Sequence, residues 1–593
     1  MSLNDELADL FEQMAVLMEL QGANSFKVIA YHKISRILRE TSIDVRQHVR
    51  DGTLDQVEGI GHSSARVITE YVQTGRSMAL DELAAGVPPG LLALLRIEGM
   101  GPKTVRLLWT QANVTSADDL RKAIESGALS GIKGIGPAKI QLMRKGLEAL
   151  ARADSTTRRA GLGEVLELAR RLLEQVRTIK GVVRAELAGS LRRRKETIAD
   201  LDIVAAVTDQ AVGQAVSDGF VKLPGVKETI VAGPTKASVK LDAGLQADLR
   251  IVPEENFGAA LMYFTGSKDH NVKVRGLAQR KGLTLNEWGL YRLEEYDRAR
   301  KKTAEAPAVR PVASRTEEEV YRALDLAFIE PEIREDRGEV EAAIEGRLPK
   351  LITLADIRGD LHTHTTASDG TASIEEMAQA AMARGYKYLA ITDYSPSSAI
   401  ANGLSVQRLK KHIAAIRKAA DRIRGIALLA GSEVDILADG RLDYEDAVLA
   451  ELDIVIASPH TALKQDERKA TDRLLQAIEH RHLNVIGHPT GRLINGRAGL
   501  PLDMGRVIKS AAASGTALEI NAGWPRLDLN DVNARAAMEG GCMLSIDTDA
   551  HGTEELDNMH YGISVARRAW VSADSVINCS DLTALRKWLA RKR

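Results

Sequence analysis

Two carboxylates separated by one residue begin the first group of side chains that could do chemistry. Asp200 and Asp202 flank Leu201 at the start of an apolar run, so in a strand both carboxylates would project from one face. A third acid, Asp248, interrupts another apolar run, where an unpaired carboxylate would be costly. Three converging carboxylates suit two Mg²⁺ or Mn²⁺ ions about 4 Å apart that activate an attacking oxygen and ease the departure of pyrophosphate.

A glycine, a serine and a basic run precede these carboxylates. Gly189 and Ser190 follow an apolar segment, and the cations come directly after them: Arg192, Arg193, Arg194 and Lys195. Guanidinium groups bind phosphate by charge-assisted hydrogen bonds. This group is therefore suited to holding a triphosphate beside the carboxylates.

A second set of candidate ligands lies in residues 351–593, which hold nine of the 13 histidines. Histidines and acids occur there at or just after the ends of short apolar runs: His362, His364, Asp369, Asp393, Glu433, His460, His488, Asp549 and His551. Such ligands favour Zn²⁺, Mn²⁺ or Fe²⁺ over Ca²⁺, and a cluster of two or three ions can activate water for attack on phosphorus. We interpret the histidines in helical or loop contexts as surface residues: His412, His480, His482 and His560.

The apolar periodicity shows which elements must position these groups. A helix over 163–178 and strands near 185–188, 201–207, 239–241 and 245–252 indicate an α/β layer around the aspartates. Beyond residue 356, helical patterns such as 374–384 and 406–423 separate seven short apolar strands, around residues 361, 388–392, 426–430, 454–457, 484–487, 517–520 and 543–546. Repeated strand-then-helix units predict a barrel of parallel strands.

A Gly-x-Gly turn between helical patterns occurs three times near the N-terminus. Its glycines are Gly59 and Gly61, Gly99 and Gly101, and Gly134 and Gly136. Glycine permits the tight turn, and the following helix starts with free N–H groups that suit an anion. The three copies resemble helix-hairpin-helix motifs, which grip DNA phosphates without reading bases.

Composition excludes several classes of protein. The length of 593 residues suggests about four domains. A net charge of −1 means that any nucleic-acid surface must be local, and two cysteines cannot staple so long a chain. No segment approaches the roughly 20 apolar residues of a membrane span. We expect a cytoplasmic protein without a membrane partner.

The aspartate region resembles the bacterial family X DNA polymerases, relatives of DNA polymerase beta, over roughly residues 1–330. The matching segments are Gly189-Ser-Leu-Arg-Arg193, Asp200-Leu-Asp202, Asp248, and Tyr263-Phe-Thr-Gly-Ser267 with Asn271 and Arg275. The resemblance implies that the three aspartates hold the catalytic metals. It also implies nucleotide and template contacts from Gly189, Ser190, Arg193, Tyr263, Phe264, Gly266, Asn271 and Arg275. Lys268 stands where the vertebrate enzyme has an acid, so the contact that this acid makes with the base does not carry over.

The N-terminal segment resembles the 5′-phosphate-binding and lyase domain of the same family. Lys27 and Tyr31 match positions that bind a 5′-phosphate in a gap. Val67 occupies the position of the lysine that forms a Schiff base. A valine cannot form an imine, so we expect no efficient lyase activity.

Residues 356–580 resemble the polymerase-and-histidinol-phosphatase (PHP) domain, a seven-stranded barrel of metal-dependent phosphoesterases. The match includes His362-x-His364, Gly431-Ser-Glu433, Ser458-Pro-His460, Gly487-His-Pro-Thr-Gly-Arg492 and Asp547-Thr-Asp-Ala-His551. The resemblance implies metal binding by His362, His364, Asp369, Glu433, His460, His488, Asp549 and His551. Tyr394 replaces a ninth ligand, usually histidine. A phenol is a poorer ligand because its pKa is about 10.

The expected fold is therefore a multidomain mixture of α+β and α/β modules. Its parts are a lyase-like helical domain (1–80), a helix-hairpin-helix domain (81–155), a nucleotidyltransferase palm (156–256), a thumb (257–335), a linker (336–355) and a PHP barrel (356–593). The resemblance implies repair of gapped or primer-template DNA with dNTPs by a monomer that is associated with the nucleoid when bound. The barrel would trim 3′ ends or cut at abasic sites.

Three alternatives remain open. The first region could be a nucleotidyltransferase that copies no template, although the helix-hairpin-helix motifs speak against this. The barrel could be a metal-binding platform without catalysis, which Tyr394 supports and the eight retained ligands oppose. It could also be an independent phosphatase for small molecules.

Overall fold

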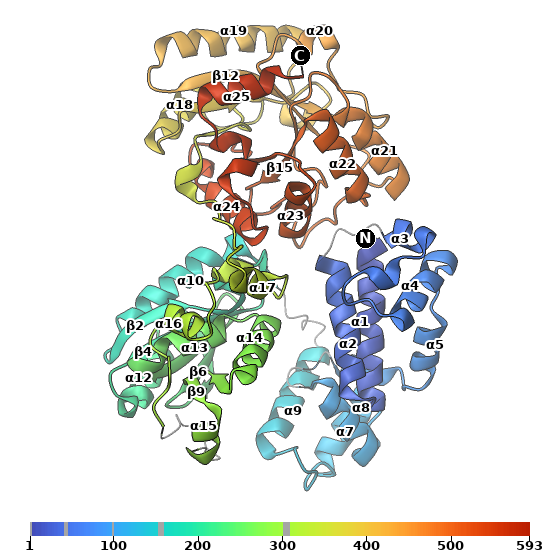
Figure 1. Cartoon of the computed structure of the whole chain (residues 1–593), viewed down its shortest axis with the longest axis vertical. Helices are drawn as coiled ribbons and strands as arrows, with labels where there is room; N and C mark the ends of the chain where they lie inside the picture. The colour runs from blue at the N-terminus through green and yellow to red at the C-terminus, as the bar shows by residue number, and fades with distance from the viewer. Residues whose placement is uncertain are drawn as a thin grey trace. The chain divides into compact units, whose positions relative to one another are not determined.

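The structure is a computed structural model that describes residues 3–40, 45–95, 97, 100–151, 159–299 and 309–592 (Figure 1). The chain forms two compact units, one of residues 1–158 with 501–505 and one of residues 159–500 with 506–593. A search of the described helices finds none with the length and apolar character that a membrane span requires.

The first unit is helical. Its α-helices are α1 (Leu3–Gln21), α2 (Ser25–Glu40), α3 (Val45–Asp51), α4 (His62–Thr74), α5 (Met78–Ala85), α6 (Gly90–Leu94), α7 (Pro102–Ala112), α8 (Ala117–Glu125) and α9 (Pro137–Ala151). One apolar cluster joins α1 to α2, α3 and α4, and another joins the C-terminal part of α1 to α6, α7, α8 and α9.

Each Gly-x-Gly turn directly precedes a helix of this unit. Gly59 and Gly134 have φ angles of +89° and +97°, which only glycine adopts at little cost. Gly61 and Gly101 cap α4 and α7 without a side chain, so no side-chain oxygen occupies the first N–H groups of these helices. The prediction for Gly99 lies outside the described residues.

Residues 159–299 hold a five-stranded sheet of order β2-β4-β7-β6-β5, which we name the palm sheet. Its strands are β2 (Val182–Leu187), β4 (Asp200–Val207), β5 (Val226–Ala232), β6 (Lys236–Leu241) and β7 (Gln246–Pro253), accompanied by α10 (Leu162–Arg177), α11 (Gly189–Arg192) and α12 (Gly213–Phe220). β4 runs parallel to β7, and the other pairs are antiparallel. The sequence did not predict β5, because nearly all of its residues are exposed and it lacks alternating burial.

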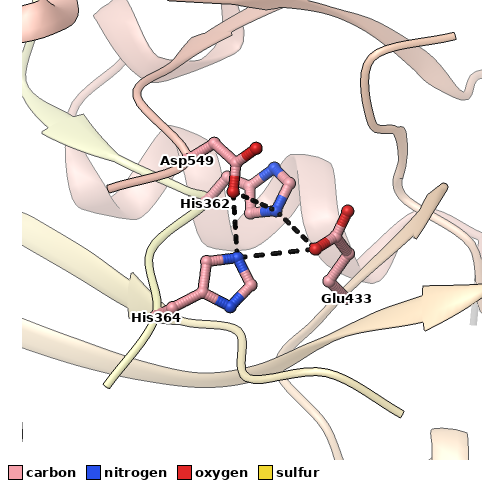
Figure 2. Close-up of side chains that lie close together, drawn as sticks. All are labelled: His362, His364, Glu433 and Asp549. Atoms are coloured by element: carbon pink, nitrogen blue, oxygen red, sulfur yellow. Dashed lines mark ion pairs between the residues drawn. The ribbon is translucent and has the colours of Figure 1, made fainter. Parts of the chain in front are cut away.

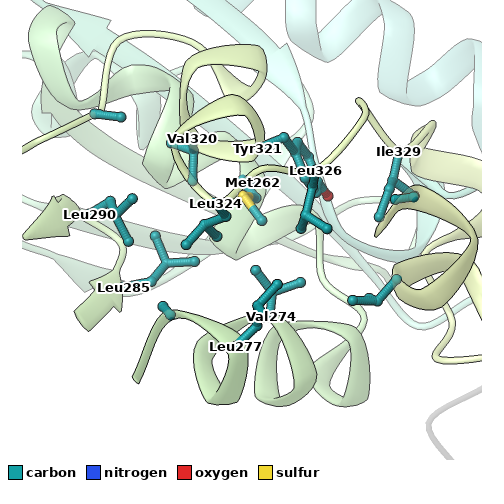
Figure 3. Close-up of a cluster of buried hydrophobic side chains, with 14 of the residues drawn as sticks. Met262, Val274, Leu277, Leu285, Leu290, Val320, Tyr321, Leu324, Leu326 and Ile329 are labelled. Carbon is teal, nitrogen blue, oxygen red and sulfur yellow. The ribbon is translucent and has the colours of Figure 1, made fainter. Parts of the chain in front are cut away.

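The thumb follows the palm sheet. It contains α13 (Phe257–Thr265), α14 (Lys268–Arg280), the hairpin β8 (Leu283–Asn286) with β9 (Gly289–Arg292), α15 (Leu293–Ala299) and α16 (Glu317–Ala323). Its apolar core includes Met262, Val274, Leu290 and Tyr321 (Figure 3).

The predicted linker, residues 336–355, is packed. It holds α17 (Glu339–Ile344), and its Val340 and Leu351 belong to the apolar core of the thumb. Trp570, far along the chain, belongs to the same core. The segment therefore joins the thumb and the barrel through shared packing.

Within residues 309–592, all of which are described, seven parallel strands pair in sequence order. They are β10 (Gly359–Asp360), β11 (Tyr388–Ile391), β12 (Ala427–Asp435), β13 (Ile454–Ser458), β14 (Val485–Ile486), β15 (Ala517–Asn521) and β16 (Leu544–Asp547). A parallel bridge between Thr363 and Ala550 brings the first and last strands together, which nearly closes the barrel. The predicted seven-stranded barrel is confirmed.

Six α-helices lie between consecutive barrel strands, and two more follow β16. They are α18 (Ile374–Ala383), α19 (Val406–Arg422), α20 (Asp446–Leu449), α21 (Glu467–Ile478), α22 (Met504–Ser514), α23 (Asp531–Glu539), α24 (Met559–Arg568) and α25 (Leu582–Ala590). Local sequence fixes their starts: Ser373 and Glu376 form a capping box at α18, and Ser405 caps α19.

Candidate active sites

The barrel brings its histidines and acids to one rim. Glu433 lies in β12, while His362 and Asp549 follow β10 and β16. His460 and His488 come after β13 and β14. The strands are parallel, so their carboxyl ends meet at the same end of the barrel, which explains why residues far apart in sequence come together.

Four of these side chains converge on one point (Figure 2). Nε2 of His364 lies 3.0 Å from Oδ1 of Asp549 and 3.4 Å from Oε2 of Glu433. Nε2 of His362 lies 3.2 Å from the same glutamate oxygen and 3.5 Å from the same aspartate oxygen. All four side chains offer ligand atoms with spacing suited to one cation.

Two further groups share members with the first. In the described part of the chain, His364, Asp369 and His551 form one group, and Glu433, His460 and His488 form the other. Oε1 of Glu433 lies 3.3 Å from Nε2 of His460 and 3.0 Å from Nε2 of His488. Glu433 therefore uses one oxygen toward each of two groups, as a carboxylate bridging two cations would. The structure brings together all eight ligands predicted from the sequence.

The chemistry of these atoms fits divalent cations. Among the described residues, no hydrogen-bond partner satisfies Nε2 of His362, Nε2 of His364, Oε2 of Glu433 or Oδ1 of Asp549, although all are buried. Buried polar atoms without partners are costly, and a cation would satisfy them together. Despite burial, Glu433 and Asp549 hold the pKa of His362 well above its usual value, and His362 holds that of Glu433 well below.

Two further carboxylates contact predicted ligands at the ring nitrogen that faces away from the cluster. Oε1 of Glu519 lies 2.7 Å from Nδ1 of His362, and Oδ1 of Asp435 lies 2.5 Å from Nδ1 of His460. Such contacts fix the orientation of a ligating imidazole and increase its basicity. We did not predict either role. The detectable signal was an acid on a buried and mostly apolar strand.

Tyr394 lies against this cluster. Its hydroxyl is 3.2 Å from Nε2 of His551, and its ring stacks on His364 with centroids 4.3 Å apart. Burial, and then the nearby Glu433 and Asp549, raise the pKa of Tyr394 above its usual value. The residue is therefore a neutral phenol in the metal-free protein and offers a hydroxyl where an imidazole would offer a nitrogen.

The surroundings of three residues in this region differ from those predicted. Asp393 belongs to none of the candidate metal groups found among the described residues. Its carboxylate instead accepts hydrogen bonds from Thr365 and Ser368 and lies 2.8 Å from Nε2 of His412. The prediction that His412 and His482 lie at the surface is wrong, because both are only 7% exposed. His412 lies on the buried face of the amphipathic helix α19, which its sequence context did not reveal.

The palm sheet brings together the three predicted aspartates. Asp200 and Asp202 lie in β4, and Asp202 pairs in register with Asp248 of the parallel strand β7. Burial, and then repulsion from the two other carboxylates, raises the pKa of Asp202 to about 7. Lys236 lies 3.0 Å from Asp248, and its charge, with a hydrogen bond from Gln246, keeps that pKa low despite burial. The excess of negative charge fits divalent cations.

The Gly189 turn lies directly beside these carboxylates. Gly189 has a φ of +60°, and an added Cβ would lie 2.0 Å from Oδ2 of Asp202. Ser190 is the next residue of the short helix α11, which ends before Arg193. The sequence did not reveal that Arg193 already has partners: its Nε donates to Glu335 over 3.1 Å, and its Nη1 donates to the carbonyl of Thr265.

The predicted nucleotide residues of the thumb line a small hollow. Tyr263, Asn271 and Arg275 line it together with Ala259, Met262 and Leu285. The Asn271 amide donates to the carbonyl of Tyr263 over 2.7 Å. Phe264 lies beneath the guanidinium of Arg250 instead, and Gly266, with a φ of +69°, turns the chain after α13.

The predicted DNA-contacting residues of the first unit differ in their exposure. Lys27 is exposed, and so are Gly59, Gly61, Gly101, Gly134 and Gly136. Tyr31 is only 8% exposed and packs against Phe11, so its ring stabilises the core. Val67 is buried in the same core.

Comparison with known proteins gives a consistent result. Residues 2–77 match a helix-hairpin-helix domain, 91–149 a SAM-like helix-hairpin-helix tandem, 260–335 the DNA polymerase beta thumb and 360–522 the PHP domain. The chain is 39% identical over 588 residues to the DNA polymerase/3′-5′ exonuclease PolX of Bacillus subtilis (strain 168), covering 99% of both chains. It is also 28% identical over 251 residues to a probable phosphatase of Thermoanaerobacter sp. (strain X514), which covers 40% of this chain and 95% of that protein.

Proposed function

The chain belongs to the PolX family of DNA polymerases with a PHP domain, and on this premise we propose that it fills short gaps in DNA and trims 3′ ends. The observation that carries the proposal is the presence in one chain of two separate ligand sets. One is the aspartate triad beside the Gly189 turn, and the other is the histidine-rich rim of the barrel.

In the palm, Asp200, Asp202 and Asp248 would hold two Mg²⁺ or Mn²⁺ ions. When bound, these ions would activate the primer 3′-oxygen and stabilise the leaving pyrophosphate. Ser190 and Arg193 would hold the β and γ phosphates, and the hollow lined by Tyr263 and Asn271 would take the sugar and base edge. Gly189 supports this arrangement because its missing side chain lets the turn approach Asp202.

In the barrel, the eight clustered ligands would hold two or three Zn²⁺, Mn²⁺ or Fe²⁺ ions. When bound, the ions would polarise water and the phosphodiester for hydrolysis. Glu519 and Asp435 would orient His362 and His460. A phosphodiesterase in the same chain as the polymerase would remove 3′ nucleotides or cut at abasic sites.

DNA would be gripped by the exposed helix-hairpin-helix turns. Their backbone N–H groups suit phosphates and read no bases. We further propose gapped or primer-template DNA and dNTPs as substrates, a monomeric chain associated with the nucleoid, and domain boundaries at 80, 155, 256, 335 and 355. Templated synthesis is the expected activity because a polymerase-type thumb accompanies these turns.

The test is an end-labelled assay on gapped DNA with the full chain. Asp202→Ala should abolish gap filling and leave 3′ trimming intact, while His362→Ala should do the reverse. The matched controls are Asp242→Asn, an exposed acid in the turn between β6 and β7, and His480→Ala, a histidine outside the metal groups. Both controls should keep both activities.

Other outcomes would support the rival functions. Bound metal without hydrolysis in the unsubstituted chain would favour a non-catalytic platform, which Tyr394 makes worth testing. Hydrolysis of small phosphate monoesters but not of DNA would favour an independent phosphatase. Extension that ignores the template base would favour an untemplated nucleotidyltransferase.

A further inference from the structure

Arg568, at the C-terminal end of α24, reaches from the barrel to the palm and thumb. It is 5% exposed. Its Nη1 donates to the main-chain carbonyl of Arg193 over 2.7 Å and to Oε1 of Glu335 over 2.9 Å. Its Nη2 donates to Asp531 over 2.8 Å, which anchors it within the barrel.

The oxygen of Glu335 that binds Arg568 also binds Arg193. Nε of Arg193 lies 3.1 Å from that oxygen, and Nη1 donates to the carbonyl of Thr265. Two of the three guanidinium nitrogens are thereby fixed. Glu335, itself 5% exposed, thus holds a palm arginine and a barrel arginine at one point.

From this geometry we infer that Arg568 of the barrel is a positioning residue for nucleotide binding in the palm, acting on Arg193 through Glu335 and through the Arg193 main chain. The inference rests on the proposed function, in which Arg193 holds the triphosphate. It assigns the barrel a part in polymerisation that is separate from its metal cluster.

The effect should fall on nucleotide affinity. Without Arg568, the main chain of Arg193 and the carboxylate of Glu335 each lose an anchor, so the guanidinium is no longer held in one orientation. The network also loses a positive charge near the site of a triphosphate. The aspartate triad has no contact with Arg568, so the chemical step should be spared.

The experiment measures kcat and KM for dNTP in gap filling by the full chain. Arg568→Gln should raise KM about tenfold and change kcat less than about threefold, as coupling across a shared partner predicts. The matched control is Arg567→Gln. Arg567 is the neighbouring residue of α24, and its Nε donates to the side chain of Glu332 over 2.8 Å. Arg568 reaches only the main-chain carbonyl of Glu332, over 3.3 Å. Loss of Arg567 therefore breaks an ion pair of the same interface and removes no hydrogen bond to Arg193 or Glu335. It should leave KM unchanged.

A double-mutant cycle separates positioning from general destabilisation. Glu335→Gln should raise KM by a similar factor, and Glu335→Gln with Arg568→Gln should be no worse than the worse single variant. Multiplied effects, or an unchanged KM in folded Arg568→Gln, would overturn the inference. If Arg568→Gln does not fold, Glu335→Gln tests the same link from the thumb, and a KM equal to that of the unsubstituted chain overturns it.

Further measurements distinguish failure of this inference from failure of the proposed function. Arg568→Gln should leave the 3′ trimming activity and the metal content of the barrel unchanged. These two measurements show whether the variant is folded. Equal affinities of the Arg568→Gln and unsubstituted chains for dNTP, measured by fluorescence on gapped DNA with Ca²⁺, would overturn this inference and leave the proposed function standing. Absence of gap filling from the unsubstituted chain would overturn both.

Discussion

The palm and the barrel both gather carboxylates, but they surround them differently. In the palm, Asp200 and Asp202 face another carboxylate, and the pKa of each is raised. In the barrel, Glu433 and Asp549 face imidazoles, and the pKa of each is lowered. The palm therefore has an excess of negative charge before any ion binds, whereas the barrel has a balanced cage.

This difference in charge indicates how each site should acquire its ions. Carboxylate oxygens gathered without imidazoles suit Mg²⁺, which keeps several waters and is bound together with substrate phosphates. Imidazoles held by Glu519 and Asp435 suit tightly bound transition metals. We expect ions that come and go with the nucleotide in the palm, and resident ions in the barrel.

Metal removal should have the largest effect, because it should stop gap filling in the palm and spare the nuclease of the barrel. After loading with Mn²⁺ and desalting into metal-free buffer, gap filling should fall by about a thousandfold or more, because the palm ions supply its chemistry. The nuclease should persist, because its ions stay bound. Gap-filling and trimming rates, with metal content by elemental analysis, measure this. Parallel loss of both activities would remove the contrast.

A second prediction concerns Glu519, which contacts His362 in the barrel. Glu519→Gln should lower its metal affinity by about 10–100-fold, because His362 loses its oriented partner. Titration with Zn²⁺ against a chelating dye measures the affinity directly. Gln476→Glu, on α21 outside the metal groups, serves as a control, and an unchanged affinity in Glu519→Gln would contradict the role of Glu519.

A third prediction concerns the charge stored in the palm. The pKa of Asp202 is raised to about 7 in the folded protein from about 4 in the unfolded chain. The folded state therefore binds more protons in this window, so the stability contributed by this group falls as pH rises from about 4 to about 7. Asp202→Asn should stabilise the metal-free protein by about 1–2 kcal/mol at pH 8, after allowance for solvent screening, and hardly at all at pH 4.

Thermal unfolding with EDTA at the two pH values measures this difference. Saturating Mg²⁺ with dNTP should cancel the advantage of Asp202→Asn, since bound cations relieve the repulsion in the unsubstituted protein. Equal stabilisation at both pH values would show that repulsion is not the cause.

The smallest expected effect comes from substitution of Tyr394 in the barrel. Tyr394→His should raise 3′ trimming by roughly a few fold and increase metal content at the group containing His551, because an imidazole replaces a neutral phenol. Tyr394→Phe should leave trimming within about twofold if the hydroxyl is not a ligand. A complete loss of trimming in Tyr394→Phe would instead identify the phenol as a required ligand.

Sequence reasoning found the parts of both sites that follow local patterns. The ends of short apolar runs indicated nine candidate ligands in the barrel, and the structure gathers all of them except Asp393 into groups that could hold metal ions. Strand alternation placed Asp200 and Asp202 on one face. The pattern could not reveal contacts that only the folded chain makes. Glu335 and Arg568 are separated by 233 positions in the sequence, and neither stands in a recognisable motif. Likewise His412 looks like a polar residue of a surface helix until its contact with Asp393 is known.

The shared packing of the thumb and Trp570 has a consequence for how the chain is made. The thumb leaves the ribosome with an apolar surface that only residues near the end of the chain complete. At about 5–20 residues per second, that surface waits roughly 10–50 s for Trp570 to be synthesised. During this interval the nascent thumb exposes an apolar surface that is open to aggregation. A ribosome that stops within the barrel releases a chain whose thumb core is still incomplete.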